Sequence, residues 1–172
     1  SVLSLILREL GKIKEAEVCI LKAISLNPNF ANAFCNHGII LRDFRNFKKA
    51  EKSFRKAIEL DPNFAIAFSN LGITLRDLGF LKKAEEYTLK AIELDPKLAI
   101  AYSNLGIIMK DIGELKKAEI VTHKAIKLDH NLLSAKYNLS LVLRDLGKLD
   151  DLIILSKSIL DLNFATKGDK LS

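Results

Sequence analysis

The sequence predicts an all-α solenoid of stacked, antiparallel helix pairs, and three observations support this fold class. Proline recurs at a fixed period of 34 residues (62 − 28 = 96 − 62 = 34), at Pro28, Pro62 and Pro96. Glycine keeps the same period at Gly38, Gly72 and Gly106. Between these positions, apolar residues recur at helical spacing. A period of this length is typical of short units that stack along one axis and share a continuous core.

Residues 31–64 show what one unit contains. Small and apolar residues at helical spacing predict a first helix near residues 32–44 and a second near residues 47–60. The first face is formed by Ala33, Phe34, His37, Gly38 and Leu41, and the second by Phe47, Ala50, Phe54, Ala57 and Ile58. Asp61 and Pro62 then end the second helix, because proline lacks the N–H group that continues the hydrogen-bond ladder.

Glycine also predicts the turn between the two helices of a unit. It occupies this turn at Gly11, Gly79, Gly113 and Gly147. Glycine adopts the left-handed conformation that commonly ends a helix. Residues 31–64 carry Arg45 and Asn46 there instead. We expect Asn46 to take the left-handed conformation, because asparagine tolerates it better than most residues do.

Small residues inside the helices predict close packing within each pair. Gly38, Gly72 and Gly106 fall in the middle of first helices, where glycine costs about 1 kcal/mol relative to alanine. We expect the second helix to approach closely at these positions. Alanines occupy the facing positions of the second helices, at Ala50, Ala84 and Ala118 and at Ala57, Ala91 and Ala125.

We therefore predict one array over residues 1–172. It comprises an incomplete repeat at 1–30, repeats at 31–64, 65–98 and 99–132, a divergent terminal repeat at 133–166, and a tail at 167–172. In the terminal repeat, Leu152 and Ile159 replace the two alanines and Phe164 replaces the proline. Larger side chains at close-packing positions predict a looser pair of helices.

The periodic positions together resemble those of the tetratricopeptide repeat (TPR), and the resemblance covers almost the whole chain. It is carried by Phe34, His37, Gly38, Leu41, Ala50, Phe54, Ala57 and Pro62, and by the residues at the same positions of later units. The resemblance implies a right-handed superhelix of helix pairs. It also implies a concave groove lined mainly by the first helix of each pair.

If this chain has the concave groove that the resemblance implies, the groove contains a row of asparagines beside a row of residues of mixed charge. These candidate binding residues are Asn36, Asn70, Asn104, Asn138, Arg42, Asp43, Arg76, Asp77, Lys110, Asp111, Arg144 and Asp145. Asparagine is a poor helix former, so its recurrence inside helices needs a reason. A carboxamide matches the C=O and N–H groups of an extended peptide. The row is similar to the asparagine ladder of the O-linked N-acetylglucosamine transferases. Alternatively, each asparagine bonds only the neighbouring helix or water.

Two interpretations of the charged row also remain open. The arginine of one unit can reach the aspartate of the next, which gives a solvated row of ion pairs, or the row reads a charged ligand. The lysine, asparagine and arginine with which some TPR domains hold a terminal carboxylate are absent. Their positions carry Cys35, Ser69 and Ser103, and Ile39, Ile73 and Ile107.

Composition excludes several function classes. The formal charge is +6, from 27 basic and 21 acidic residues that are interleaved, which does not favour a nucleic-acid or membrane partner. The two cysteines, Cys19 and Cys35, have no metal-ligand spacing, so we expect free thiols, no metal and a cytoplasmic location. We find no catalytic motif and predict neither enzymatic activity nor a cofactor.

The function that these features favour is a protein–protein interaction scaffold that binds an extended peptide or protein segment in its groove. One alternative is a substrate-recruiting arm of a larger enzyme, of the glycosyltransferase or sulfotransferase type. Another is an array that associates with itself through its terminal helices. The terminal helices carry apolar residues on more than one side, among them Val2, Leu3, Ile6, Ile153 and Leu160.

Overall fold

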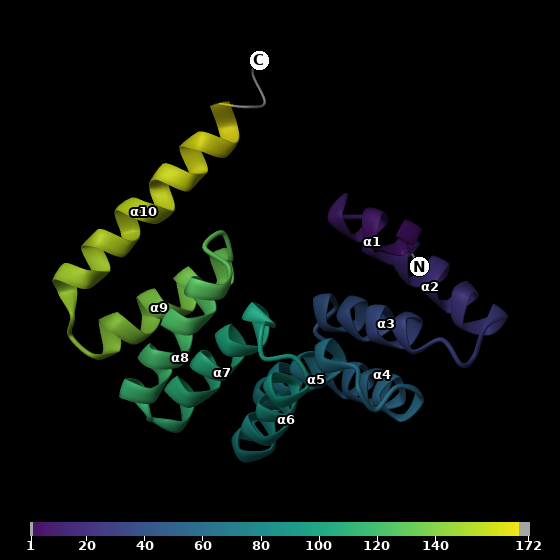
Figure 1. Ribbon diagram of the computed structural model, residues 1–172. Helices are drawn as coiled ribbons and strands as arrows, with labels where there is room; N and C mark the ends of the chain where they lie inside the picture. Colours follow the sequence, from purple (N-terminus) through teal and green to yellow (C-terminus); the bar gives the residue numbers. More distant parts are fainter. Residues whose placement is uncertain (1, 169–172) are drawn as a thin grey trace. The chain divides into compact units, whose positions relative to one another are not determined.

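The computed structural model describes the backbone of residues 2–168 and the side chains of residues 2–160, and this part of the chain contains ten helices and no strand (Figure 1). Residues 169–172 of the expected tail, and the side chain of Phe164, lie outside the described part. The helices are α1 (Val2–Glu9), α2 (Ile13–Leu26), α3 (Ala31–Asp43), α4 (Phe47–Leu60), α5 (Ala65–Asp77), α6 (Leu81–Leu94), α7 (Ala99–Ile112), α8 (Leu115–Leu128), α9 (Leu133–Asp145) and α10 (Leu149–Gly168). The prediction of ten paired helices is confirmed.

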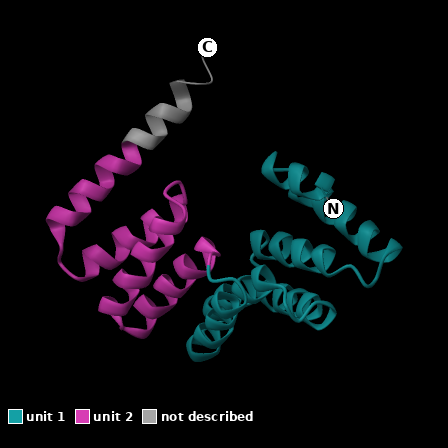
Figure 2. Cartoon of the chain, in the orientation of Figure 1, with its two compact units in different colours: residues 1–96 teal, residues 97–172 magenta. Residues whose placement is uncertain are grey.

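The chain divides into two compact units, residues 1–96 with α1 to α6 and residues 97–172 with α7 to α10 (Figure 2). In unit 1, Ala16 and Ile20 of α2 pack against Ala33 and Ile40 of α3, which joins the first helix pair to the second. In unit 2, the first helix α7 packs on α8, and α9 packs on both. No helix among the described residues is long and apolar enough to cross a membrane.

The turns between paired helices follow the glycine prediction, with one correction. Positive φ angles occur at the four predicted glycines, Gly11 (75°), Gly79 (85°), Gly113 (98°) and Gly147 (73°). In the turn between α3 and α4, the left-handed residue is Arg45 (φ 57°), and Asn46 has a φ of −88°. The expectation for Asn46 was wrong because Arg45, one period before Gly79, holds the position that must reverse the chain. Asn46 instead lies at the start of α4.

The glycines inside the first helices mark close approaches, as predicted. A Cβ atom at Gly38 would lie 2.6 Å from the ring of Phe54. A Cβ atom at Gly72 would overlap the Thr88 hydroxyl and lie 3.0 Å from the Ala84 carbonyl oxygen. The facing alanines of the internal repeats are fully buried. Small residues on both helices therefore permit the short separation.

The terminal pair, α9 and α10, packs more loosely. Leu152 and Ile159 are only half-buried, whereas the alanines at the same positions of the internal repeats are fully buried. A cavity of about 360 Å³ lies beside this pair, lined in part by Leu139 of α9 and Leu155 of α10. His123 of α8 also lines this cavity. Bulkier residues at the close-packing positions hold α10 away from α9.

Lys136 is an unusual core residue of the same pair. It occupies the position that carries Phe34, Phe68 and Tyr102 in the preceding repeats, yet only 6% of its surface is exposed. Its Nζ donates a hydrogen bond to Ser158 Oγ of α10 at 3.1 Å. A lysine thus replaces an aromatic ring at a packing position, which agrees with the looser packing of α9 against α10.

Candidate functional site

The asparagines of unit 1 lie on α3 and α5, and one of them links the two helices. Asn70 Nδ2 donates to Cys35 Sγ at 3.8 Å. Asn36 is half-buried, and no described residue hydrogen-bonds its carboxamide. The Oδ1 atom of Asn70 likewise has no partner in the described part of the chain. Unit 1 therefore presents carboxamide oxygens that remain available as acceptors.

The asparagines of unit 2 are more involved in structure. Asn138 Nδ2 donates to the backbone oxygen of Ser103 at 3.1 Å and to Ser103 Oγ at 3.0 Å. Asn104 is only 8% exposed. Thus Asn70 and Asn138 both use their amide nitrogens to bind the residue 35 positions earlier on the preceding first helix (70 − 35 = 138 − 103 = 35). The interpretation in which asparagine bonds the neighbouring helix holds for these two donors.

The charged residues form pairs between successive repeats, as one of the two interpretations predicted. Arg8 pairs with Asp43, and Arg42 Nη2 lies 3.1 Å from Asp77 Oδ2. In unit 2, Lys110 Nζ lies 3.1 Å from Asp145 Oδ2. Each pair joins a basic residue of one repeat to the aspartate of the next, so the row is close to neutral within each unit.

The neighbouring charges complete this row. Arg76 lies 3.5 Å from Asp77, Lys110 lies 3.9 Å from Asp111, and Arg144 lies 2.9 Å from Asp145. The hydrogen bonds from Lys110 and Arg144 lower the pKa of Asp145. Its carboxylate therefore stays ionised at neutral pH.

Two titratable groups beside the asparagines are held neutral by burial. Burial raises the pKa of the Cys35 thiol to about 11, and the hydrogen bond from Asn70 opposes that rise only in part. Burial also lowers the pKa of His37, whose Nδ1 lies 3.2 Å from Ser53 Oγ. Glu17 opposes the lowering and Lys49 adds to it. Both groups therefore favour their uncharged forms at neutral pH.

One cluster, formed by Arg55 of α4, Phe68 of α5 and Tyr87 of α6, was not predicted from the sequence. Arg55 Nη1 donates to the Tyr87 hydroxyl at 2.9 Å, and its guanidinium lies 5.3 Å from the centre of the Tyr87 ring. Phe68 stacks on the same ring at a centroid distance of 6.1 Å. Arg55 and Tyr87 are 32 residues apart, close to one period, and this spacing could have indicated that they lie near each other on successive second helices. The cluster fastens α4 to α6 within unit 1.

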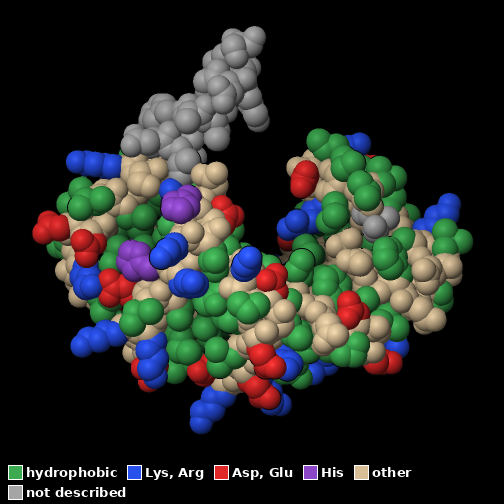
Figure 3. All heavy atoms as spheres, viewed as in Figure 1, with side chains coloured by type: hydrophobic (Ala, Val, Ile, Leu, Met, Phe, Trp, Pro, Cys, Tyr) green, Lys and Arg blue, Asp and Glu red, His purple; other side chains and the backbone are tan. Residues whose placement is uncertain are grey.

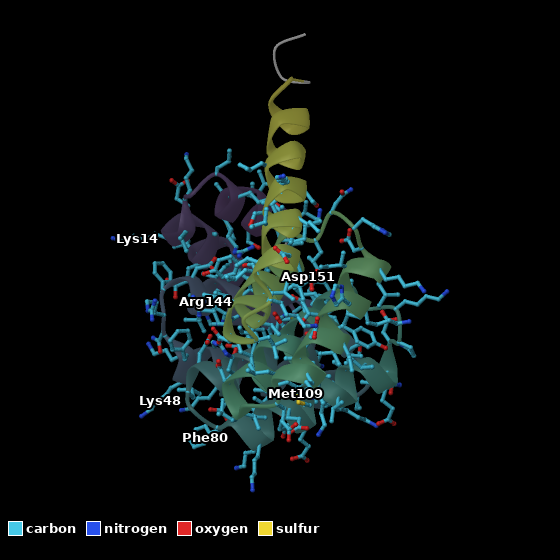
Figure 4. The ribbon with its side chains drawn as sticks, turned by 90° about the vertical axis from the view of Figure 1, so that its left-hand side faces the viewer. Lys14, Lys48, Phe80, Met109, Arg144 and Asp151 are labelled. Atoms are coloured by element: carbon cyan, nitrogen blue, oxygen red, sulfur yellow. The ribbon has the colours of Figure 1, made fainter. Side chains whose placement is uncertain are left out.

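Charged side chains elsewhere are spread over the surface. Basic and acidic groups are interspersed on the face in view, so neither sign forms a continuous patch there (Figure 3). Lys14 and Lys48 extend away from the helices that carry them (Figure 4). Among the residues whose side chains are described, no three His, Cys, Asp or Glu side chains are placed to hold a metal ion.

Comparison with known proteins identifies the repeat. Two family models, both described as tetratricopeptide repeat, match the sequence, one at residues 2–30 and 31–64 and the other at residues 53–86 and 87–120. No curated protein matches the sequence significantly.

Several solved structures share the fold. A thermophilic TPR protein of Thermus thermophilus is 20% identical, with a TM-score of 0.84 and coverage of 99% of this chain and 96% of its own. PilF of Pseudomonas aeruginosa is 21% identical, with a TM-score of 0.78 and coverage of 92% and 72%. MamA is 23% identical, with a TM-score of 0.71 and coverage of 94% and 95%. At these identities, the likeness concerns the fold alone.

Proposed function

Because the chain belongs to the tetratricopeptide repeat family, whose arrays are protein–protein interaction scaffolds, we propose that it binds an extended segment of a partner protein along its first helices. The binding residues of this proposal are the asparagine row and the charged row beside it. The observation that carries it is the set of carboxamide oxygens of Asn36 and Asn70, which have no acceptor role within the described part of unit 1.

The asparagine geometry suits recognition of a peptide backbone. The Nδ2 atom of Asn70 is bonded to Cys35, which fixes the orientation of the carboxamide before a ligand arrives. The Oδ1 atom is then directed as an acceptor for a backbone N–H group. Ordering the side chain in advance lowers the entropic cost of binding.

The spacing of the helices sets the expected repeat of the contacts. Packed helices lie about 8–10 Å apart, and an extended chain advances about 3.3 Å per residue. Adjacent asparagines of one unit should therefore contact every third residue of the bound segment. Such contacts read the backbone and leave the intervening side chains free to vary.

The charged row favours a partner segment without strong net charge. Each basic side chain that bonds a following aspartate, such as Arg42 with Asp77, has its charge balanced within the array. A highly acidic segment would have to compete with these aspartates. We therefore expect the affinity to depend only weakly on salt, because exposed charges that are already paired contribute little long-range attraction.

The test uses a panel of fluorescein-labelled peptides, each fifteen or so residues long and of varied sequence, titrated by fluorescence anisotropy. The double variant Asn36→Ala with Asn70→Ala should bind a peptide recognised by wild type about 5- to 150-fold more weakly, at about 0.5–1.5 kcal/mol for each lost hydrogen bond. Asn36 is chosen because no described residue depends on its carboxamide.

Asn63→Ala is the matched control. Asn63 is exposed in the loop that follows α4, outside the asparagine row, and its substitution should leave the affinity unchanged. The melting temperature should stay close to that of wild type in all variants. The proposal is wrong if the double variant binds as tightly as wild type, or if wild type binds no peptide of the panel.

Self-association is a second candidate function, favoured by the exposure of apolar side chains on the terminal helices. Val2 is 70% exposed on α1, and Ile153 and Leu160 of α10 are 53% and 55% exposed. A cytoplasmic location is part of the proposal as well. The cytoplasmic location is supported by two free thiols, at Cys19 and Cys35, which suit a reducing compartment.

A further inference from the structure

Internal repeats show how one helix pair receives the next. At the junction of α2 with α3, Ile40 of α3 packs against Ala16 and Ile20 of α2. The position of Ile40 is filled by Thr74, Ile108 and Val142 in the later repeats, and all four side chains are 0% exposed. The same junction carries the ion pair from Arg8 to Asp43, and equivalent pairs join Arg42 to Asp77 and Lys110 to Asp145. The junction of α2 with α3 thus combines a buried apolar contact with one charged pair.

The helix α1 displays the receiving half of such a junction without a preceding repeat among the residues described. Ile6, one period before Ile40, is 48% exposed. Leu3, one period before His37 and two before the fully buried Leu71, is 57% exposed. We call Val2, Leu3, Ile6 and Glu9 the N-terminal face. No described residue forms an ion pair with Glu9, which occupies the position of the paired aspartates Asp43, Asp77 and Asp145.

The helices α9 and α10 display the other half. Ile153 is 53% exposed and stands where the preceding repeats carry Glu17, Glu51, Glu85 and Glu119. Tyr137 is 62% exposed and stands where they carry Cys35, Ser69 and Ser103. We call Tyr137, Arg144, Ile153 and Leu160 the C-terminal face. The side chain of Arg144 is 60% exposed, against 27% for Arg42 and 18% for Lys110.

The two faces complement each other in charge. In the array, the residue at the position of Arg144 pairs with the acidic residue of the following repeat. The only acidic partner of Arg144 in the described part of the chain is its own neighbour, Asp145. Glu9 offers the missing acidic group at the matching position.

Both faces also differ from the internal repeats at the position of the hydrogen bond between asparagine and cysteine or serine. Within the array, an asparagine bonds a cysteine or serine of the preceding repeat, as Asn70 does with Cys35. On the N-terminal face, the asparagine position holds Val2, and on the C-terminal face the acceptor position holds Tyr137. A regular repeat would bring an amide against the Tyr137 ring. Val2 instead brings an apolar side chain that suits it.

We propose that the N-terminal face of one copy docks on the C-terminal face of a second copy, as the next repeat would, with Glu9 paired to Arg144 and Val2 against Tyr137. The proposal rests on the second candidate function and specifies its interface. Because the two faces differ, the contact is head-to-tail, and each copy retains one free face for a further copy.

The experiment measures molar mass by light scattering over a wide range of protein concentration. Wild type should increase in mass with concentration. Ile6→Lys places a charge on the N-terminal face alone, and Ile153→Lys places one on the C-terminal face alone. Each substitution should weaken association more than tenfold. Mixed in equal amounts, the two variants should form a dimer that grows no further, since each supplies the intact face that the other lacks. Formation of this dimer also shows that both variants are folded.

Two further comparisons make the result specific. Ile154→Lys is the matched control, because Ile154 is 66% exposed at a position that is also exposed in the internal repeat, at Ile120. Glu9→Arg and Arg144→Glu should each weaken association about two- to fivefold, and the combined variant should recover it. Association of wild type without rescue in the mixture would overturn the head-to-tail interface alone. A wild type that stays monomeric at every concentration would overturn self-association as well, and neither result bears on peptide binding.

Discussion

Arg45 is the clearest case in which a single residue opposes the local backbone. Its φ angle of 57° lies in the left-handed region, which every other paired-helix turn in the described chain fills with glycine. A side chain there costs about 1–2 kcal/mol, because Cβ approaches the following carbonyl oxygen. The Arg45 guanidinium lies 5.7 Å from the centre of the Phe47 ring, which offsets part of this cost.

We expect Arg45→Gly to raise the free energy of unfolding by about 0.5–1 kcal/mol, since glycine removes the steric cost but loses the contact with Phe47. Urea denaturation monitored by circular dichroism measures the change. The reciprocal substitution Gly79→Arg, in the equivalent turn, should lower the stability by a similar or larger amount. A less stable Arg45→Gly protein would show that the contact with the ring outweighs the backbone cost.

The backbone conformation of a turn is predictable from the sequence where the residue type alone determines it. It is not predictable where the position of the residue within the repeat determines it. The turn glycines were predictable because few residues adopt positive φ without cost. Asn46 was chosen over Arg45 from the tolerance of asparagine, but the geometry of the turn fixes the left-handed site one residue earlier. The burial of Lys136 was not predictable either, because an isolated lysine in a helix usually lies in solvent.

At the scale of helices, the closeness of the pairs α5–α6 and α7–α8 depends on a glycine that faces a threonine. Thr88 of α6 is fully buried and donates its hydroxyl to the Ala84 backbone oxygen at 2.7 Å. Thr122 of α8 repeats this arrangement with Ala118 at 2.6 Å. Both hydroxyls point at the glycine of the facing first helix. A threonine that satisfies its hydroxyl within its own helix can therefore act as a packing residue.

Gly72→Ala should lower the free energy of unfolding by about 1–2 kcal/mol, because the new Cβ overlaps the Thr88 hydroxyl and this outweighs the gain in helix propensity. In a Thr88→Ala background the same change should cost less, because only the Ala84 carbonyl oxygen, 3.0 Å away, still crowds the new Cβ. A double-mutant cycle by urea denaturation measures the coupling. Gly79→Ala is the control: it meets no atom within 4 Å, so its cost comes from the backbone and should not respond to Thr88→Ala.

The candidate site was predictable in its positions and less so in its contacts. The period placed the asparagines and the charged residues on the first helices, and it suggested that a basic residue reaches the next aspartate. The pairs Arg42 with Asp77 and Lys110 with Asp145 confirm that suggestion. Which atoms of an asparagine remain open to a ligand depends on the separation of neighbouring helices, and sequence spacing does not give that distance.

For the molecule as a whole, burial falls toward both ends. The helices α5 and α7 each bury eight residues. The helix α1 buries only Ser4, and none of the described side chains of α10 is buried. A repeat array is held together by contacts between neighbours, so helices that have a neighbour on one side only are the least protected.

Hydrogen exchange in dilute solution should therefore be graded along the chain. Amides of α5 and α6 in unit 1 and of α7 and α8 in unit 2 should exchange slowest, and those of α1 and α10 should exchange more than about tenfold faster. Exchange monitored by mass spectrometry resolves the individual helices. Uniform protection from α1 to α10 would contradict a stability that is set by neighbour contacts.

The charged pairs have a consequence for how such a protein can evolve. Within each unit, a repeat contributes a basic residue toward the next repeat and an acidic residue toward the preceding one, as Arg42 and Asp43 do. A tandem duplication of one repeat would therefore restore both junctions at once, without any compensating point mutation. A gene of this kind can therefore gain or lose a whole repeat without breaking the register of its ion pairs.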